Sequence, residues 1–275
     1  MSTKRHDFEV PIDEQRVVRV SVDEPLKPTS RSKTILFIPG FKGFKDWGGW
    51  PWFCAELARA GHRVLRVNPS MCGVGASLDS FDEPARFAQQ TLGHDVEDLE
   101  TVLMRPEVGS DDVIIMGHSR GGIVAALTAA ASSQIAGVIT LGTPDQLLDI
   151  SDDEMEEWRS RGKREIVNAR TGQVLFQHSS VLEDYLEQED FYNAPDALAT
   201  ASVPVLAIHG AADTAVKSCC ATKLLEDVDS ALARLVLIDG AGHTFGLVHP
   251  FIGPHPAAQQ VLQVVTEWIQ EVWPR

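Results

Sequence analysis

Six short apolar runs, separated by segments of helical periodicity, constrain the fold of this chain more than any other feature. The runs are continuous rather than alternating, and they span residues 34–38, 63–67, 113–116, 138–141, 203–208 and 235–238. A continuous apolar run of this length is typical of a strand buried on both faces, as in a parallel sheet covered by helices.

The segments between these runs predict helices. We expect them at about 50–60, 92–104, 123–131, 218–225 and 256–272. Alternation of strand and helix predicts an α/β fold, with helices on both faces of a mostly parallel sheet. Residues 8–22 instead alternate apolar and charged side chains, which predicts an antiparallel hairpin at the sheet edge.

One long connection interrupts this alternation. Residues 145–195 contain an acidic run over 152–157 and a predicted hairpin over 166–176, turning near Arg170-Thr171-Gly172. A connection of this length with structure of its own indicates an inserted cap. We therefore expect a core formed by residues 1–144 and 196–275, with a cap over residues 145–195.

Charge and composition exclude several classes of partner. The chain has 39 acidic and 24 basic side chains, a net charge of -15, which argues against binding to nucleic acid. It contains no apolar stretch of about 18 residues and no signal-peptide pattern, so we expect a cytoplasmic protein with no membrane partner. The four cysteines and nine histidines lack the spacing of a zinc site. The sequence gives no indication of the oligomeric state.

The motif that indicates chemistry follows the run at 113–116. Residues 117–121 read Gly-His-Ser-Arg-Gly, which fits G-x-S-x-G between a strand and a helix. A tight turn there would need Gly117 and Gly121 where a Cβ would collide, and it would expose the Ser119 hydroxyl at a helix N-terminus. We therefore predict that Ser119 is a nucleophile; the alternative is a glycine-rich turn with an incidental serine.

A serine nucleophile needs a base to take its proton and an acid to orient that base. Asp213 follows the run at 203–208, and His243 follows the run at 235–238 in a loop of small residues. Parallel strands bring such loops to one sheet edge, so we predict the order Ser119, Asp213, His243. Asp239 is the alternative acid, and we expect His118 and His209 to be structural.

Three segments together resemble the α/β-hydrolase superfamily, in its dienelactone-hydrolase-like and serine-aminopeptidase-like branch. They read GHSRGG at 117–122, HGAADTAV at 209–216 and GAGHTFG at 240–246. The resemblance implies the triad named above and an oxyanion hole formed by the backbone N–H groups of Phe41 and Arg120. The chain departs from dienelactone hydrolases proper, which have cysteine where it has Ser119.

Aromatic residues are the expected lining of the substrate pocket. Residues 41–53 hold six aromatic side chains beside the oxyanion loop, and the predicted cap adds others. Such rings favour a bulky acyl or aryl group. The candidates are Phe44, Trp47, Trp158 and Phe176; the alternative is that part of this cluster seats the first helix on the sheet. The Arg120 side chain is expected either to pair with Asp95 or Asp98, or to bind a substrate carboxylate.

The combined interpretation is a serine hydrolase that cleaves small-molecule carboxylic esters through an acyl-enzyme on Ser119, without a cofactor. An acyl-peptidase, a thioesterase or an acyltransferase would use the same triad, so these alternatives stay open. A noncatalytic receptor or scaffold is the alternative from another class.

Overall fold

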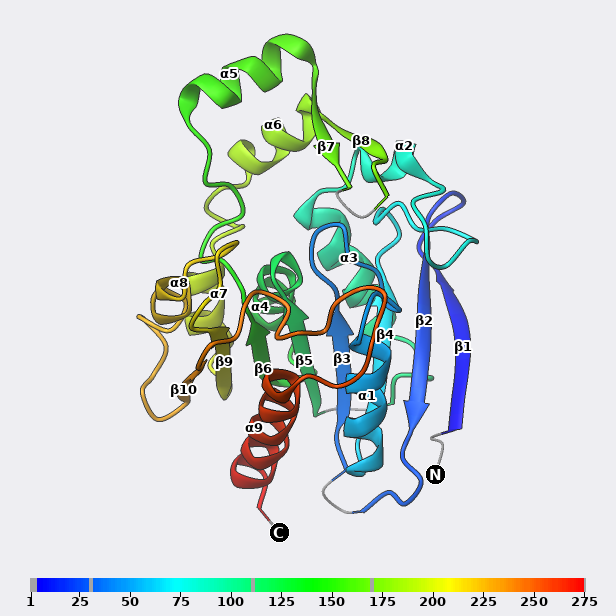
Figure 1. The fold of residues 1–275 in the computed structure, drawn as a ribbon, viewed down its shortest axis with the longest axis vertical. Helices are drawn as coiled ribbons and strands as arrows, with labels where there is room; N and C mark the ends of the chain where they lie inside the picture. The colour runs from blue at the N-terminus through cyan, green and yellow to red at the C-terminus, as the bar shows by residue number, and fades with distance from the viewer. Residues whose placement is uncertain (1–3, 30–31, 110–111, 169–170, 275) are drawn as a thin grey trace.

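An eight-stranded sheet forms the centre of the computed structural model, which describes residues 4–29, 32–109, 112–168 and 171–274 (Figure 1). The strands are β1 (Lys4–Pro11), β2 (Val17–Glu24), β3 (Thr34–Ile38), β4 (Arg63–Asn68), β5 (Val113–His118), β6 (Ile135–Leu141), β9 (Val205–Gly210) and β10 (Ala233–Ile238). Their order is β1-β2-β4-β3-β5-β6-β9-β10. Strands β3, β4, β5, β6, β9 and β10 run parallel, and β2 is antiparallel to both β1 and β4. The mostly parallel sheet with an N-terminal antiparallel hairpin is therefore confirmed.

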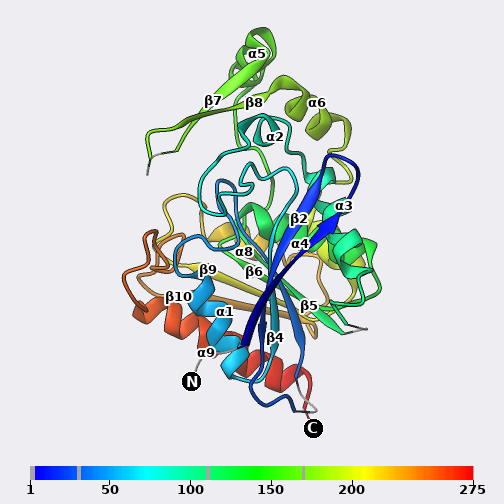
Figure 2. The same ribbon diagram turned by 90° about the vertical axis from the view of Figure 1, so that its right-hand side faces the viewer.

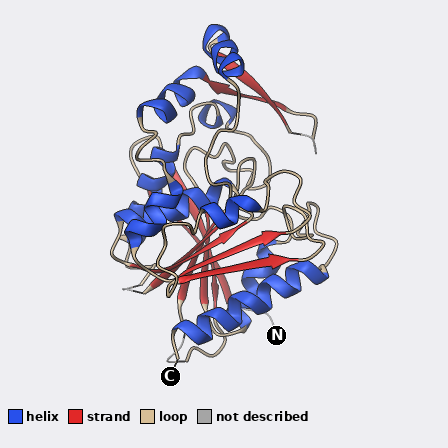
Figure 3. Ribbon diagram, turned by 90° about the vertical axis from the view of Figure 1, so that its left-hand side faces the viewer, coloured by secondary structure: helices blue, strands red, loops and turns tan. Residues whose placement is uncertain are grey.

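Helices cover both faces of the sheet, as Figures 2 and 3 show. One face packs against α1 (Trp50–Arg59) and α9 (Pro256–Val272), and the other against α3 (Leu92–Leu103), α4 (Arg120–Ala131) and α7 (Ala194–Ala201). The short helices α2 (Pro84–Phe87) and α8 (Cys219–Lys223) lie in connections. Helix α4 begins three residues before the predicted start, because the chain passes directly from β5 through Ser119 into the helix.

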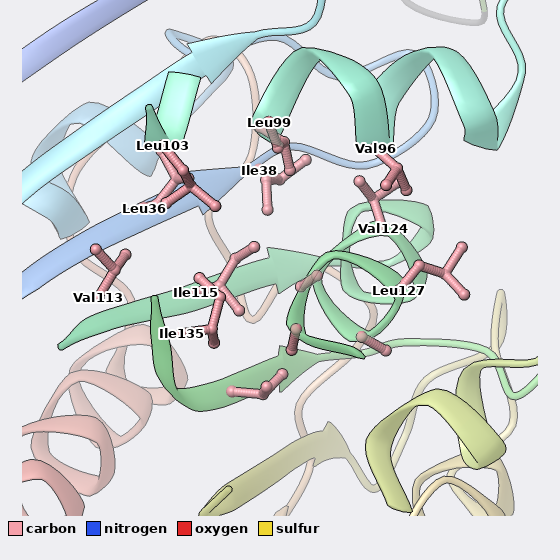
Figure 4. Packing of buried hydrophobic residues seen from close by; sticks show 14 of the residues in the cluster. Leu36, Ile38, Val96, Leu99, Leu103, Val113, Ile115, Val124, Leu127 and Ile135 are labelled. Atoms are coloured by element: carbon pink, nitrogen blue, oxygen red, sulfur yellow. The ribbon is translucent and has the colours of Figure 1, made fainter. Parts of the chain in front are cut away.

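Alternate side chains of the central strands divide between two apolar layers. Leu36 and Ile115 pack with α3 and α4, as Figure 4 shows, whereas Ile35 and Ile114 pack with α1 and α9. All four side chains are fully buried. This two-sided burial is the reason why the strands read as continuous apolar runs in the sequence.

Residues 145–195 lie in the connection from β6 to β9, and we name this segment the insertion. It contains α5 (Asp152–Arg161), β7 (Lys163–Val167), β8 (Val174–His178) and α6 (Ser179–Glu187), and β7 and β8 form a separate antiparallel sheet. The predicted hairpin is therefore present, while Arg170 of its expected turn lies outside the described residues. The expected boundary at residue 195 falls within α7, whose first residue is Ala194.

The insertion lies at the end of the molecule toward which the parallel strands point (Figure 1). It contacts the core through β8, where Leu175 joins a buried apolar cluster that includes Phe44 and Phe87. The backbone N–H of His178 also donates to the Ala88 carbonyl at 2.8 Å. These contacts hold the insertion above the carboxyl ends of the strands, where parallel sheets place their functional residues.

Candidate active site

The backbone at Ser119 forms a strained turn between β5 and α4. Its φ is 53° and its ψ is -125°, in the positive-φ region that a serine rarely adopts. Two hydrogen bonds hold the turn: the Ser119 N–H donates to the Leu141 carbonyl, and the Gly122 N–H donates to the Ser119 carbonyl, each at 2.8 Å. The sheet and the helix thus fix the serine at the top of β5.

Glycines allow neighbouring backbone segments to lie in close contact around this turn. A Cβ at Gly117 would collide with the Gly121 carbonyl, and a Cβ at Gly121 would lie 2.5 Å from the Ile38 carbonyl oxygen. Both collisions are the ones expected from the G-x-S-x-G pattern. A Cβ at Gly40 would lie 3.0 Å from the Ser119 Cβ, so the loop after β3 also lies directly against the turn.

Asp213 and His243 form a hydrogen-bonded pair in the loops after β9 and β10. The His243 Nδ1 lies 2.8 Å from the Asp213 Oδ2, and the Asp213 side chain is fully buried. Its other oxygen accepts the backbone N–H groups of Ala215 (2.8 Å) and Val216 (3.0 Å). Burial opposes ionisation of Asp213, but the hydrogen bonds from Val216 and His243 hold its pKa below the ordinary value. The buried group is therefore a carboxylate that orients the imidazole.

The strand β6 brings this pair beside the serine. Leu141, the last residue of β6, accepts the hydrogen bond from Ser119, and the next residue, Gly142, lies against the pair. A Cβ at Gly142 would be 3.4 Å from the His243 Nδ1 and 3.6 Å from the Asp213 Oδ2. The three predicted residues are thus gathered at neighbouring strand ends, whereas Asp239 is exposed.

Two further histidines support the site from below. The His118 ring is buried 4.8 Å from the His243 ring, and its Nε2 donates to the His243 carbonyl at 3.0 Å. Burial and the neighbouring His243 lower the pKa of His118 to about 3, so it is neutral at pH 7. The fully buried His209 donates from Nε2 to the Val216 carbonyl at 3.0 Å, and the same nitrogen is 3.3 Å from the Asp213 Oδ2.

Ser119 opens into a cavity of about 500 Å³ between the core and the insertion. Phe41 and Arg120 line it from the core, and Trp158, Arg164 and Gln177 line it from the insertion. The third wall is the segment from residue 214 into α8. This volume is in the range of pockets that enclose small organic ligands.

A sequence model described as the alpha/beta hydrolase family matches residues 35–258, most of the chain. The chain belongs to the alpha/beta hydrolase family. A search of functionally curated proteins finds no match to this hydrolase.

Solved structures share the fold of this hydrolase at low sequence identity. Est1E from Butyrivibrio proteoclasticus, with ferulic acid bound, is 20% identical with a TM-score of 0.72, over 96% of this chain and 98% of that one. The esterase domain of a Rhodothermus marinus protein is 18% identical over 98% of both chains, with a TM-score of 0.65. A dienelactone hydrolase from Anabaena variabilis is 18% identical over 99% of both, with a TM-score of 0.63.

Three predicted pocket residues of the hydrolase lie away from the cavity. Phe44 is fully buried in a cluster with Phe87. Trp47 stacks on His249 with ring centroids 5.9 Å apart. The Lys163 ammonium lies over the ring of Phe176. None of the three lines the cavity that Ser119 opens into. In β8 side chains alternate between the faces, so the cavity receives Gln177 in place of its neighbour Phe176.

The hydrolase holds the Arg120 side chain in a buried ion pair with Asp95. Asp95 is fully buried and also accepts the Gln90 amide at 3.0 Å and 3.1 Å. Of the two acids expected as partners, Asp98 is instead bound by the Ser70 N–H (2.6 Å) and hydroxyl (2.9 Å). The guanidinium of Arg120 is thus neutralised where it borders the cavity.

Sequence reasoning missed Arg164 and Gln177 as cavity residues. Only the alternation of β7 and β8 could have indicated them, and it does not say which face of the hairpin is turned inward. Within the described ranges, no group of three or more His, Cys, Asp or Glu side chains is placed to hold a metal ion. None of the described helices combines the length and apolarity needed to cross a bilayer.

Proposed function

We propose that this protein is a serine hydrolase that cleaves carboxylic esters through an acyl-enzyme on Ser119. The observation that carries the proposal is the 2.8 Å contact of His243 Nδ1 with the buried Asp213, beside the strained turn that exposes Ser119. An ionised Asp213 keeps the proton of His243 on Nδ1, which leaves Nε2 free as a base.

The reaction would proceed in two halves. His243 Nε2 takes the Ser119 proton as Oγ bonds to the ester carbonyl carbon, and the carbonyl electron pair moves to oxygen. The tetrahedral intermediate then breaks its bond to the alcohol, which leaves with the proton from His243. In the second half, His243 Nε2 takes a proton from water as the water oxygen bonds to the acyl carbon. The bond to Ser119 Oγ then breaks, Oγ recovers its proton from His243, and the acid leaves.

The oxyanion would be stabilised by the backbone N–H groups of Phe41 and Arg120. Arg120 is the first residue of α4, where the N–H groups have no partner within the helix. Phe41 follows Gly40, the residue packed against the Ser119 Cβ, and it lines the same cavity. Two such donors, when they are preorganised, lower the activation free energy by several kcal/mol, about 3 kcal/mol for each.

The insertion, residues 145–195, would act as a cap over a core of residues 1–144 and 196–275. Its side chains Trp158, Arg164 and Gln177 form one wall of the cavity above Ser119. A covered site excludes water and admits small molecules. The four cysteines are all free, which fits a reducing compartment such as the cytoplasm.

One structural neighbour is described as an esterase domain and another as a dienelactone hydrolase, which favours an ester over a thioester or peptide substrate. At this identity they establish the fold alone, so the substrate class needs a direct test.

A fluorophosphonate probe tests the proposal without assuming a substrate, because it reacts with activated serines. We expect one probe per chain by intact mass, located on Ser119 by peptide mapping. Ser119→Ala and His243→Ala should both abolish labelling, and the wild type should hydrolyse p-nitrophenyl esters. Absence of both labelling and hydrolysis in folded protein would reject the proposed function in favour of a noncatalytic role.

A further inference from the structure

Three side chains of the insertion form a rigid cationic unit on the cavity wall. The Arg164 guanidinium lies 3.8 Å from the centre of the Trp158 ring. Its Nε and Nη2 both donate to the Gln177 side-chain oxygen, at 2.9 Å and 2.6 Å, and Gln177 is the residue opposite Arg164 in the hairpin. The Trp158 indole N–H in turn donates to the backbone carbonyl of Gln177 at 3.0 Å. The guanidinium plane is therefore held in one orientation.

This arrangement leaves one edge of the guanidinium unused. Among the described residues, no carboxylate lies within 4 Å of Arg164, and no hydrogen bond is formed by its Nη1. Gln177 occupies the Nε and Nη2 side, so the free donors are on the Nη1 and Nη2 edge. That edge has the geometry that binds both oxygens of a carboxylate.

The Arg164 side chain is partly buried although it has no acidic partner among the described residues. Arg164 is half-buried, and burial lowers its pKa to about 10, against the opposing attraction of Glu154. The group still carries its charge at pH 7. A cation partly removed from water without an acidic partner gains most from an anionic ligand.

The charge of the cavity lining is opposite to that of the chain. The protein has a net charge of -15, yet four basic and two acidic side chains line the cavity: Arg120, Arg164, Lys217, Lys223, Asp145 and Asp149. Arg120 pairs with Asp95, and Lys223 pairs with Asp145 at 2.8 Å. Arg164 on the insertion and Lys217 on the opposite wall remain without an ion-pair partner among the described residues.

A second hollow on the insertion also borders Arg164, but its charge is different. Its lining has three acidic side chains, Glu154, Glu157 and Glu165, and three basic ones, Arg161, Lys163 and Arg164. The charges of that hollow therefore balance, whereas basic side chains outnumber acidic ones in the cavity that holds Ser119. An anionic group would therefore approach Arg164 from the cavity that holds Ser119.

We infer that the substrate carries a carboxylate at the end remote from the scissile ester bond, and that Arg164 binds this carboxylate, with Lys217 as a second cation. The inference rests on the proposed function, because it places the ester carbonyl at Ser119. It narrows the substrate class from carboxylic esters in general to half-esters of dicarboxylic acids and similar anionic esters.

A matched pair of esters tests this inference. One is p-nitrophenyl hemiadipate, and the other is the same ester with an isopropyl group in place of the carboxylate. The measured quantity is the ratio of kcat/KM for the anionic ester to kcat/KM for the neutral ester, after subtraction of the uncatalysed rates. We expect the wild type to favour the anionic ester and Arg164→Gln to lower the ratio by about 10- to 100-fold. Lys217→Gln should lower it less, because that side chain is exposed.

Arg161→Gln is the matched control, since Arg161 lies on the same insertion but is exposed and pairs with Glu157 at 2.8 Å. This variant should keep the wild-type ratio. Thermal unfolding of each variant shows whether the insertion is intact. A wild type that hydrolyses both esters equally, with the same ratio in Arg164→Gln, would overturn the inference and leave the proposed function standing. Failure of both hydrolysis and fluorophosphonate labelling would instead overturn the proposed function, and the inference with it.

Discussion

His118 Nε2 donates a hydrogen bond to the backbone carbonyl of His243 at 3.0 Å, so the residue before the nucleophile holds the loop that carries the proposed base. The two rings are also packed with their centroids 4.8 Å apart. The position of His243 relative to Ser119 is thus set from inside the core as well as by Asp213.

His118→Phe should therefore impair catalysis more than folding. Phenylalanine fills the buried site but lacks the donor, and the freed loop should lower kcat/KM by about tenfold, the equivalent of about 1.4 kcal/mol. The measurement is ester hydrolysis together with the unfolding midpoint in urea. His62→Phe is the control: His62 is also buried, but it contacts the Lys33 N–H away from the site. Equal losses of activity in both variants would contradict a positioning role for His118.

Replacing the two candidate acids separately identifies the triad acid. Asp213→Asn should reduce kcat by about 10³- to 10⁴-fold, because the amide no longer fixes the tautomer of His243. Asp239→Asn should stay within about twofold, since that side chain is exposed and solvated. Steady-state rates with one activated ester suffice. The reverse ranking would assign the acid to Asp239.

Much of this site could be predicted because its residues follow parallel strands that read as apolar runs, although the edge strand β10 leaves Leu235 and Leu237 exposed. Each proposed triad member comes directly after a continuous apolar run, and parallel strands must bring those positions to one edge. The run at 34–38 matches β3 at both ends. The predicted start of α4 is too late because the first turn of the helix contains Gly121 and Gly122, which have low helix propensity.

The pocket lining could not be predicted in the same way. Whether an aromatic residue in a loop faces the substrate or the core depends on packing against distant segments. Phe44 is buried in one cluster with Phe81 and Phe87, which lie in and just before α2, about 40 residues later in the chain. In the hairpin, alternation separates Phe176 from Gln177, but only the docking of Leu175 on the core determines which of them lines the cavity.

The buried carboxyl of Asp98 should make stability fall as pH rises. Burial and the neighbouring Asp95 raise the pKa of Asp98 to about 7, although hydrogen bonds from Ser70 oppose this. The folded state then holds a proton that the unfolded chain, with a pKa near 3.9, releases. Between these two pKa values the folded state binds more protons, so the slope of unfolding free energy against pH is negative.

We expect this group to lower the free energy of unfolding by about 3 kcal/mol between about pH 5 and about pH 8. Asp98→Asn cannot lose a proton and should lack that component of the slope. Urea unfolding of the wild type and the variant at both pH values measures it. Asp79→Asn, an exposed acid, should keep the wild-type slope. A slope in Asp98→Asn equal to that of the wild type would show that Asp98 does not titrate in this range.

The Arg120–Asp95 pair should show strong coupling in a double-mutant cycle. The Asp95 side chain is fully buried and the Arg120 side chain is 10% exposed, so removal of either partner leaves a buried charge without compensation. Asp95→Leu and Arg120→Met should each cost about 3–5 kcal/mol of stability, whereas the double variant should cost much less than their sum. Denaturant unfolding of the four proteins gives the coupling free energy.

The exposed Arg161–Glu157 pair, with side chains 71% and 56% exposed, is the comparison and should couple by at most about 0.5 kcal/mol. Additive losses at Arg120 and Asp95 would mean that the two charges are solvated independently, and that the cavity floor beside Ser119 is open to water.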